Sequence, residues 1–361
     1  MAKDLNDRLL EGKPLDLEGE PWPESSPADP SQNTLEKPAM LHWDGDDPAL
    51  YETEPPAREW LIRAGLEEHA PGFLSRGEVG ILAAPGSSGK TWAMVALAIA
   101  VALGRPWLGY RTTAKGGRVA LLMAEETRDE LRRRIRAQAA AMYVRPGDLA
   151  GRLSWVTRAD MPPEGPTLVY PVDGPFSSLA GSLSPFGQRV LASLHEKAQE
   201  RGPWDLIIAD PLSAFGPPDC EIDNASATAT MRAIERLCEL PGNPAVLVTH
   251  HTRKGAGKEG AAEADDIRGA SGLVNRARWA ATLSRLPPSD RWPGSRFTCL
   301  QVVKSNYAPD VDPLVYVHPA QAHGAIRAAD PDERATVTPK RKADTMPIAK
   351  KKPVTREDTD G

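Results

Sequence analysis

The residues best suited to chemistry lie in a glycine-rich turn at positions 84–91. Apart from an alanine at its first position, the turn matches the phosphate-binding pattern G-x-x-x-x-G-K-[ST]. In such a loop the glycines let the backbone wind around a polyphosphate, the lysine reaches the β- and γ-phosphates, and the threonine hydroxyl can ligate Mg²⁺. A Gly/Ser-rich turn before a helix is the plainer interpretation. The pattern nevertheless favours a site for ATP and Mg²⁺ formed by Pro85, Gly86, Ser87, Ser88, Gly89, Lys90 and Thr91.

Two further strand-like runs end in carboxylates. Residues 205–210 read DLIIAD, and α/β sheets bind ligands at the carboxyl ends of their strands. We therefore expect Asp210 to help hold Mg²⁺ through water. The run 118–124 is followed by Glu125 and Glu126. Either carboxylate could cap the next helix, but Glu125 stands closer to the strand and is the better candidate for positioning an attacking water.

Two adjacent histidines, His250 and His251, end a fourth strand-like run. A single histidine there could be hydrogen-bonded structure, and a pair could bind a metal. No further cluster of histidines or cysteines supports a metal site. We therefore favour a third interpretation, in which His250 contacts the γ-phosphate and reports its loss.

The elements that must position these side chains alternate along the chain. Short, almost continuously apolar runs predict strands buried on both faces, and such strands alternating with helices are typical of a parallel sheet covered by helices. The last apolar runs alternate with a period of two, which favours antiparallel strands at the C-terminal edge. The predicted class is therefore α/β, with strands at 77–85, 118–124, 205–210, 245–250, 277–286, 296–303 and 313–318 and helices at 90–104, 127–142, 187–201 and 227–240.

Charge and proline divide the chain into three parts. Of 361 residues 35 are proline, and residues 1–55 hold eight of them, with 14 acidic and 4 basic side chains. That composition predicts a disordered acidic leader. Residues 326–361 lack apolar periodicity and carry two lysine clusters, so we expect a disordered basic tail, either simply solvated or bound to a phosphate backbone. A folded domain is expected over 56–325, interrupted by a Pro/Gly-rich stretch at 159–185.

The sequence also limits the cellular compartment in which the protein is expected. The first residues have no apolar core of a signal peptide, and the longest apolar run, 92–103, is too short to span a bilayer. The three cysteines lie far apart with no C-x-x-C pair, which excludes a cysteine zinc site and suits a reducing compartment. We expect a cytoplasmic protein with no membrane partner.

Seven segments together resemble a known family: APGSSGKT, LLMAEETRDELRRRI, LIIADPLSAF, DNASATA, VTHHTRKG, RGASGLVNRARW and VKSNYAP. They are similar to the RecA-like P-loop ATPases and, among these, to the RepA-type hexameric replicative helicases of plasmids and phages. The resemblance covers about residues 56–310. It departs from the AAA+ arrangement, in which a glutamate directly follows the strand aspartate, because Pro211 follows Asp210 here. The leader, the 159–185 stretch and the tail have no obvious counterpart.

The resemblance implies roles for single residues. Lys90 and Thr91 would bind phosphate and Mg²⁺ with Asp210, and Glu125 would be the catalytic carboxylate. Arg134 would lie near the adenine base, and His250 would be the phosphate sensor. Arg278 would be an arginine finger that enters the neighbouring subunit's ATP site, with Arg268 and Lys304 as competitors for that role. A surface cation is the plain alternative for each of these three.

An arginine finger that comes from a neighbouring subunit implies that the protein forms an oligomer. The resemblance predicts a homo-oligomer, a hexameric ring with ATP between subunits, acting as a helicase or translocase on single-stranded DNA. The long irregular stretch 252–270 would face the DNA, with Arg253, Lys254 and Lys258 as candidate contacts, although a solvated loop fits each residue nearly as well. A replication initiator, a primase or a single-strand-binding protein would be further partners. The alternative is a RecA-like, DNA-dependent ATPase without helicase activity, such as a recombination mediator or a nucleotide switch.

Overall fold

A computed structural model describes residues 44–113, 115–171, 181–253, 262–269, 271–307 and 311–337. Two compact units are distinguished, Met1–Ala57 and Arg58–Gly361. The described part of the first unit contains the short helix α2 (Ala49–Glu52). The large sheet, its covering helices and every candidate site residue that the structure describes belong to the second unit.

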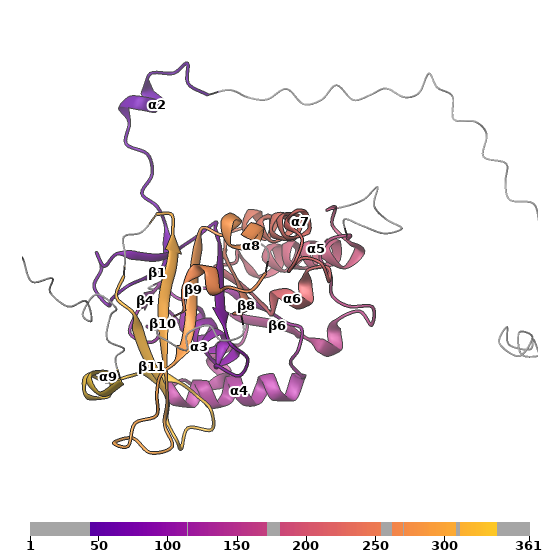
Figure 1. The fold of residues 1–361 in the computed structure, drawn as a ribbon. Coiled ribbons are helices and arrows are strands. Elements are labelled where there is room, and N and C mark those ends of the chain that lie inside the picture. Colours follow the sequence, from indigo (N-terminus) through magenta and orange to yellow (C-terminus); the bar gives the residue numbers. More distant parts are fainter. Residues whose placement is uncertain are drawn as a thin grey trace, which may run out of the picture. The chain divides into compact units, whose positions relative to one another are not determined.

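The second unit is built on a nine-stranded sheet with the order β12-β11-β10-β9-β3-β8-β7-β5-β6 (Figure 1). The six strands from β9 to β6 in that order run parallel, while β10, β11 and β12 continue the sheet in antiparallel pairs. This arrangement confirms the predicted α/β class with antiparallel strands at the C-terminal edge. The strands are β3 (Val79–Ala84), β5 (Val119–Met123), β6 (Leu153–Thr157), β7 (Leu206–Asp210), β8 (Ala245–His251), β9 (Trp279–Arg285), β10 (Arg296–Ser305), β11 (Leu314–His318) and β12 (Arg327–Ala328).

Helices cover both faces of the sheet because the central strands are apolar on both sides. Side chains alternate between the faces of a strand, so Ile208 of β7 joins one core cluster and its neighbour Ile207 joins the other. Helices α3 (Lys90–Leu103) and α4 (Arg128–Ala141) belong to the first cluster. The opposite face carries α5 (Pro185–Arg201), α6 (Leu212–Phe215), α7 (Asn224–Glu235) and α8 (Ser271–Arg276) (Figure 1).

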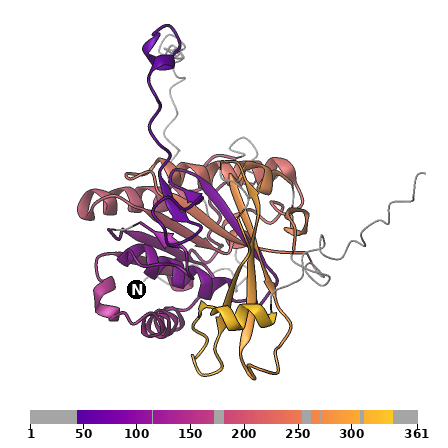
Figure 2. The same ribbon diagram turned by 90° about the vertical axis from the view of Figure 1, so that its left-hand side faces the viewer.

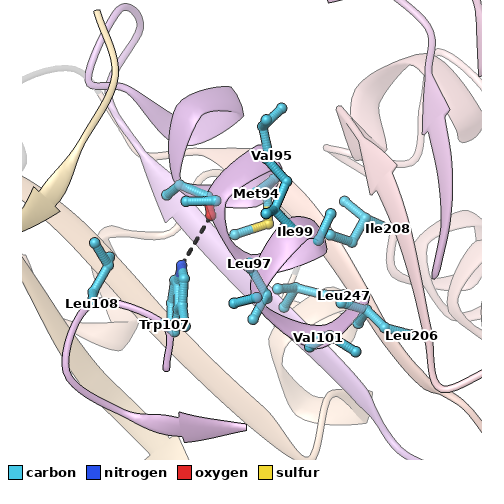
Figure 3. Packing of buried hydrophobic residues seen from close by; sticks show 14 of the residues in the cluster. Met94, Val95, Leu97, Ile99, Val101, Trp107, Leu108, Leu206, Ile208 and Leu247 are labelled. Carbon is cyan, nitrogen blue, oxygen red and sulfur yellow. Dashed lines mark hydrogen bonds between the residues drawn. The ribbon is translucent and has the colours of Figure 1, made fainter. Parts of the chain in front are cut away.

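Helix α3, which starts within the phosphate loop, is almost wholly buried. Every residue from Ala93 to Ala102 is inaccessible or nearly so. Leu97 packs in the same cluster as Leu206 and Leu247 of the sheet, and the indole N–H of Trp107 donates to the Ala93 carbonyl at 3.1 Å (Figure 3). Truncating a leucine buried in this way typically costs about 2–5 kcal/mol, so the packing fixes the start of α3 firmly under the loop.

Several elements are absent from the sequence prediction. A small antiparallel sheet, β2-β1-β4, is formed by β1 (Trp60–Arg63), β2 (Gly72–Ser75) and β4 (Arg111–Thr112). Edge strand β6 was also not predicted. Short 3-10 turns at Pro146–Leu149, Arg158–Asp160, Arg236–Glu239 and Ala264–Asp266 complete the connections.

The first part of the predicted basic tail is folded. Strand β12 pairs with β11, and helix α9 (Pro331–Val337) lies beside β10 and β11 (Figure 2). Glu333 of α9 is buried and accepts from both guanidinium nitrogens of Arg327 at 2.7 Å, while Val337 packs with Phe297. The expected tail over 326–361 is therefore folded up to 337. Its lysine clusters, the leader up to residue 43 and residues 172–180 of the 159–185 stretch lie outside the described residues.

Among the helices that the structure describes, none is long and apolar enough to cross a membrane.

Candidate nucleotide-binding site

A cavity of about 340 Å³ opens at the carboxyl end of the central strands. We call it the phosphate cavity. Its walls combine the predicted phosphate loop with carboxylates from the strand ends and with residues of β9, β10 and β11, which pair antiparallel with one another and which we call the antiparallel extension. The lining residues are Ser87, Ser88, Gly89, Lys90, Thr91, Trp92, Glu125, Glu126, Arg134, Asp210, Pro211, His251, Arg285, Arg296, Thr298 and His318.

The phosphate loop turns sharply between the end of β3 and the first turn of α3. Gly89 has a φ of 91°, and a Cβ on it would lie 2.6 Å from Nε2 of His318. Both the left-handed backbone and this close approach require glycine there. A Cβ on Gly86 would meet nothing within 4 Å, so that side of the loop faces open space. The loop thus presents backbone to the cavity.

Lys90 lies along the inner side of this loop. Its side chain is buried, and Nζ donates to the carbonyls of Ala84 at 3.0 Å and Pro85 at 3.4 Å. Burial lowers the pKa of Lys90, and the nearby carboxylates of Asp210 and Glu125 oppose that shift. A cation held in this way is suited to phosphate oxygens.

The hydroxyl of Thr91 and the carboxylate of Asp210, both predicted to help hold Mg²⁺, lie side by side in the cavity. Thr91 Oγ1 donates to Asp210 Oδ2 at 2.8 Å, and the hydroxyl of Thr249 donates to the other carboxylate oxygen. Asp210 is 7% exposed and ends β7. Hard oxygen donors of this kind, which leave several positions to water and phosphate, suit Mg²⁺. The residues present therefore fit this metal.

The two glutamates after β5 have different surroundings. Glu126 pairs with Arg134 at 3.0 Å, and its pKa is raised by burial, an effect that Arg134 partly offsets. Glu125 is exposed, lines the cavity and forms no ion pair within the part of the chain described. Because Met123 pairs in register with Asp210, Glu125 follows two residues beyond the position that lies opposite Asp210. This placement suits a group that activates water.

Arg134 lines the phosphate cavity beside Trp92. Its guanidinium is held by Glu126 and by Glu130, at 3.1 Å, and lies 5.6 Å from the ring centre of Trp92. Trp92 directly follows the phosphate loop, so a flat aromatic and a fixed guanidinium border the same end of the cavity.

The structure places His251, and not His250, in the phosphate cavity. Side chains alternate along β8, so Thr249 and His251 face the phosphate loop while His250 faces the other side. His251 Nδ1 lies 3.3 Å from Lys90 Nζ. His250 is fully buried, and its Nε2 meets the backbone carbonyl of Arg268 at 2.8 Å. The structure therefore does not support the predicted contact of His250 with the γ-phosphate, because His250 does not line the cavity and its neighbour His251 does.

The three candidate fingers differ in their surroundings. Lys304 donates to the carbonyls of Val274 at 2.8 Å and Asn275 at 2.9 Å and so caps the end of α8. Arg268 pairs with Glu221 at 2.8 Å. Arg278 is half-exposed and lies 4.0 Å from Glu78. None of the three lines the phosphate cavity of its own chain.

The candidate DNA contacts are only partly described. Arg253 is exposed, and its backbone N–H donates to the Asp266 carbonyl at 2.8 Å. Lys254 and Lys258 lie outside the described residues.

Five residues of the cavity wall were not predicted from the sequence: Trp92, Arg285, Arg296, Thr298 and His318. The place of this wall follows from the directions of the strands and not from any local pattern in the sequence. Strand β9 runs parallel to β3, so its last residue, Arg285, must lie at the same edge of the sheet as the phosphate loop.

The parallel sheet, the phosphate loop and the acidic strand ends define a P-loop ATPase. The chain matches the family described as AAA domain over residues 35–257, well over half of its length. It therefore belongs to this family of P-loop ATPases. No curated protein matches the chain. Strands β9, β10 and β11 lie beyond the matched residues, and so do Arg278 and Lys304.

Proposed function

We propose that this protein is an ATP-hydrolysing, ring-forming helicase or translocase of the RepA type. It would act on single-stranded DNA in the replication of a plasmid, a phage or another mobile element. The family match supports ATP hydrolysis.

The observation that carries the proposal is the position of Arg278. Its backbone N–H donates to the carbonyl of Val79, the first residue of β3, whereas the phosphate loop follows the last residue, Ala84. Five residue steps of strand separate the two ends by roughly 16 Å. Arg278 therefore lies at the opposite edge of the sheet from its own nucleotide site. A half-exposed arginine there suits a finger for the neighbouring subunit.

The stretch after β8 offers a route from the nucleotide to DNA. It begins directly after His251, which contacts Lys90 in the phosphate cavity. Its base is closed by a bridge between Thr252 and Ile267, and Arg268 at its far end pairs with Glu221. A change at the γ-phosphate could thus reach the segment that carries Arg253. Residues 56–361 also have a net charge of +5, which favours a nucleic-acid partner.

Several residues of the chain have distinct roles in ATP hydrolysis. ATP with Mg²⁺, when bound, supplies the phosphoryl group that is transferred to water. Glu125 orients that water and accepts its proton, and Lys90 places positive charge against the phosphates. Thr91 and Asp210 would hold the metal with their oxygens. Arg278 of a neighbouring copy would add charge as the transition state forms.

Strand displacement on forked DNA tests the proposal. We expect ATPase activity that single-stranded DNA stimulates, unwinding that requires hydrolysis, and hexamers in mass measurements with ATP and DNA. Clear ATPase activity without unwinding under any nucleotide condition would instead favour the recombination mediator or nucleotide switch. Filaments in place of closed rings would argue against the ring.

A further inference from the structure

Two arginines of the antiparallel extension face the phosphate loop from within the same subunit. Arg285 is the last residue of β9 and Arg296 is the first residue of β10, and both line the phosphate cavity. The resemblance assigns neither residue a role, and both lie beyond the family match. They form a second cationic wall opposite Lys90.

The register of the strands explains why these side chains converge. Arg285 pairs with Thr298, and Arg296 pairs with His318. Directly paired residues of antiparallel strands share a face, and so do residues two apart on one strand. Arg285, Arg296, Thr298 and His318 therefore lie on one face of the extension, and His318 Nε2 is the atom that a Cβ on Gly89 would meet. That face is the one turned toward the loop.

The charges in the cavity leave these guanidinium groups available to an anion. Glu126 is held by Arg134, and Asp210 accepts from two threonines. Arg285 donates to the Ser87 carbonyl of the phosphate loop. Within the described chain, neither Arg285 nor Arg296 forms an ion pair with a carboxylate.

His318 does not compete with the arginines for an anion. Its Nδ1 lies 2.7 Å from the Gly324 carbonyl, so Nδ1 carries the proton and donates it. Burial lowers the pKa of His318, the hydrogen bond to the Gly324 carbonyl opposes that shift, and the charges of Arg296 and Arg285 add to the lowering. The ring is therefore neutral at pH 7, and the positive charge of this wall belongs to the arginines.

We propose that Arg285 and Arg296 bind the phosphates of the nucleotide in cis, as a clamp supplied by the same subunit that supplies Lys90. This inference rests on the proposed ATP-binding function and adds two ligands to it. A guanidinium offers a planar fork of donors that matches phosphate oxygens. Arg285 also fastens the phosphate loop through Ser87, so it couples the loop to the extension.

Equilibrium binding of a fluorescent ATP analogue to the full chain tests the clamp, with unlabelled tripolyphosphate as competitor. Because a hydrogen bond to a charged group contributes about 1.5–3 kcal/mol, Arg285→Ala and Arg296→Ala should each weaken ATP binding by about tenfold or more. Tripolyphosphate binding should weaken in parallel, because it has no base or ribose. Arg285→Lys and Arg296→Lys keep the charge and should recover part of the loss.

Arg291 provides a matched control. It lies on the same hairpin, is exposed and pairs with Asp332 at 3.5 Å, outside the cavity. Arg291→Ala should bind ATP within about twofold of the unaltered chain, as typical surface substitutions do. If Arg285→Ala and Arg296→Ala behave like Arg291→Ala, the clamp is refuted. Weaker binding of ATP without weaker binding of tripolyphosphate would also refute the clamp, because the arginines would then contact the base or ribose.

Subunit mixing separates cis from trans action. A site that lacks Arg285 cannot be completed by a neighbour if the clamp acts in cis, so mixing Arg285→Ala with Glu125→Gln chains should restore no ATPase activity. Recovery would overturn the assignment. None of the binding measurements requires DNA or a ring, so a failure of the helicase proposal would remain distinguishable from a failure of the clamp.

Discussion

The hydroxyl of Thr91 donates to the carboxylate of Asp210 at 2.8 Å, and this bond joins the first turn of α3 to the end of β7. Asp210 also accepts from Thr249 at the end of β8. The carboxylate of Asp210 in β7 is therefore hydrogen-bonded to residues of two other elements, α3 and β8, at the phosphate cavity. A Mg²⁺ ion bound here would draw on oxygens whose positions the fold has already set.

Replacing Asp210 tests this arrangement. Asp210→Asn keeps an oxygen that can accept from the threonines but removes the negative charge. We expect the Mg²⁺ concentration for half-maximal ATPase activity to rise by about 10–100-fold. Asp160, just after edge strand β6, lies outside the cavity, so Asp160→Asn should leave the Mg²⁺ requirement unchanged. An unaltered Mg²⁺ dependence in Asp210→Asn would remove Asp210 from the metal site.

The role of Glu125 is tested by separating binding from turnover. Glu125→Gln should bind ATP almost as the unaltered chain does, while its ATP turnover falls by at least about a hundredfold because the water loses its base. Single-turnover hydrolysis measured beside equilibrium binding checks both. Asp129→Asn, in the exposed first turn of α4, is the control and should turn over normally. Surviving hydrolysis in Glu125→Gln would show that another group activates the water.

Arg278 should act only on a neighbour. Arg278→Ala is expected to lower turnover by about a thousandfold, the lower end of what arginine fingers supply, with little change in ATP affinity. Mixing Arg278→Ala with Glu125→Gln chains should restore activity, because one chain offers Glu125 and the other offers the finger. Lys304→Ala removes the cap of α8 and should lower the melting temperature instead. Failure of the mixture to recover would argue against a shared site.

Stability should fall in mild acid because of His250. Burial lowers the pKa of His250 to about 4, against about 6.5 in an unfolded chain. Between these values the unfolded state binds more protons, so the free energy of unfolding decreases as the pH falls from 6.5 toward 4, by about 3 kcal/mol for this residue. Thermal unfolding across that range measures the slope.

The matched variant for this measurement is His250→Gln, whose amide can still donate to the Arg268 carbonyl. It should show a flatter dependence of melting temperature on pH than the unaltered chain. Equal slopes in the two proteins would mean that other groups cause the acid sensitivity.

The sequence predicted the parts of the fold that depend on local pattern. Strands β3, β5, β7 and β8 are continuous apolar runs, and α3 follows a loop whose spacing is itself diagnostic. The strands β1, β2 and β4 span only four, four and two residues, too few for a local pattern to be recognised, and they pair with one another. Edge strand β6 is partly exposed along most of its length, so its pattern is weak.

The site was less predictable because it depends on which face of a strand each side chain takes. His250 and His251 are adjacent, and only the pairing of β8 with its neighbours decides that His251 faces the phosphate loop. Arg285 and Arg296 are far from the loop along the chain. Their relation to it follows from β9 being parallel to β3 and β10 reversing direction, which no local pattern indicates.

The order of strands along the chain has a consequence for how the protein matures. The phosphate loop lies at residues 84–91, but the wall opposite it is made by β9, β10 and β11, which end at His318. A nascent chain would carry a complete phosphate loop long before it could enclose a nucleotide. A ligand that binds only the finished fold stabilises that fold by mass action. ATP would therefore stabilise fully synthesised and correctly paired molecules over incomplete ones.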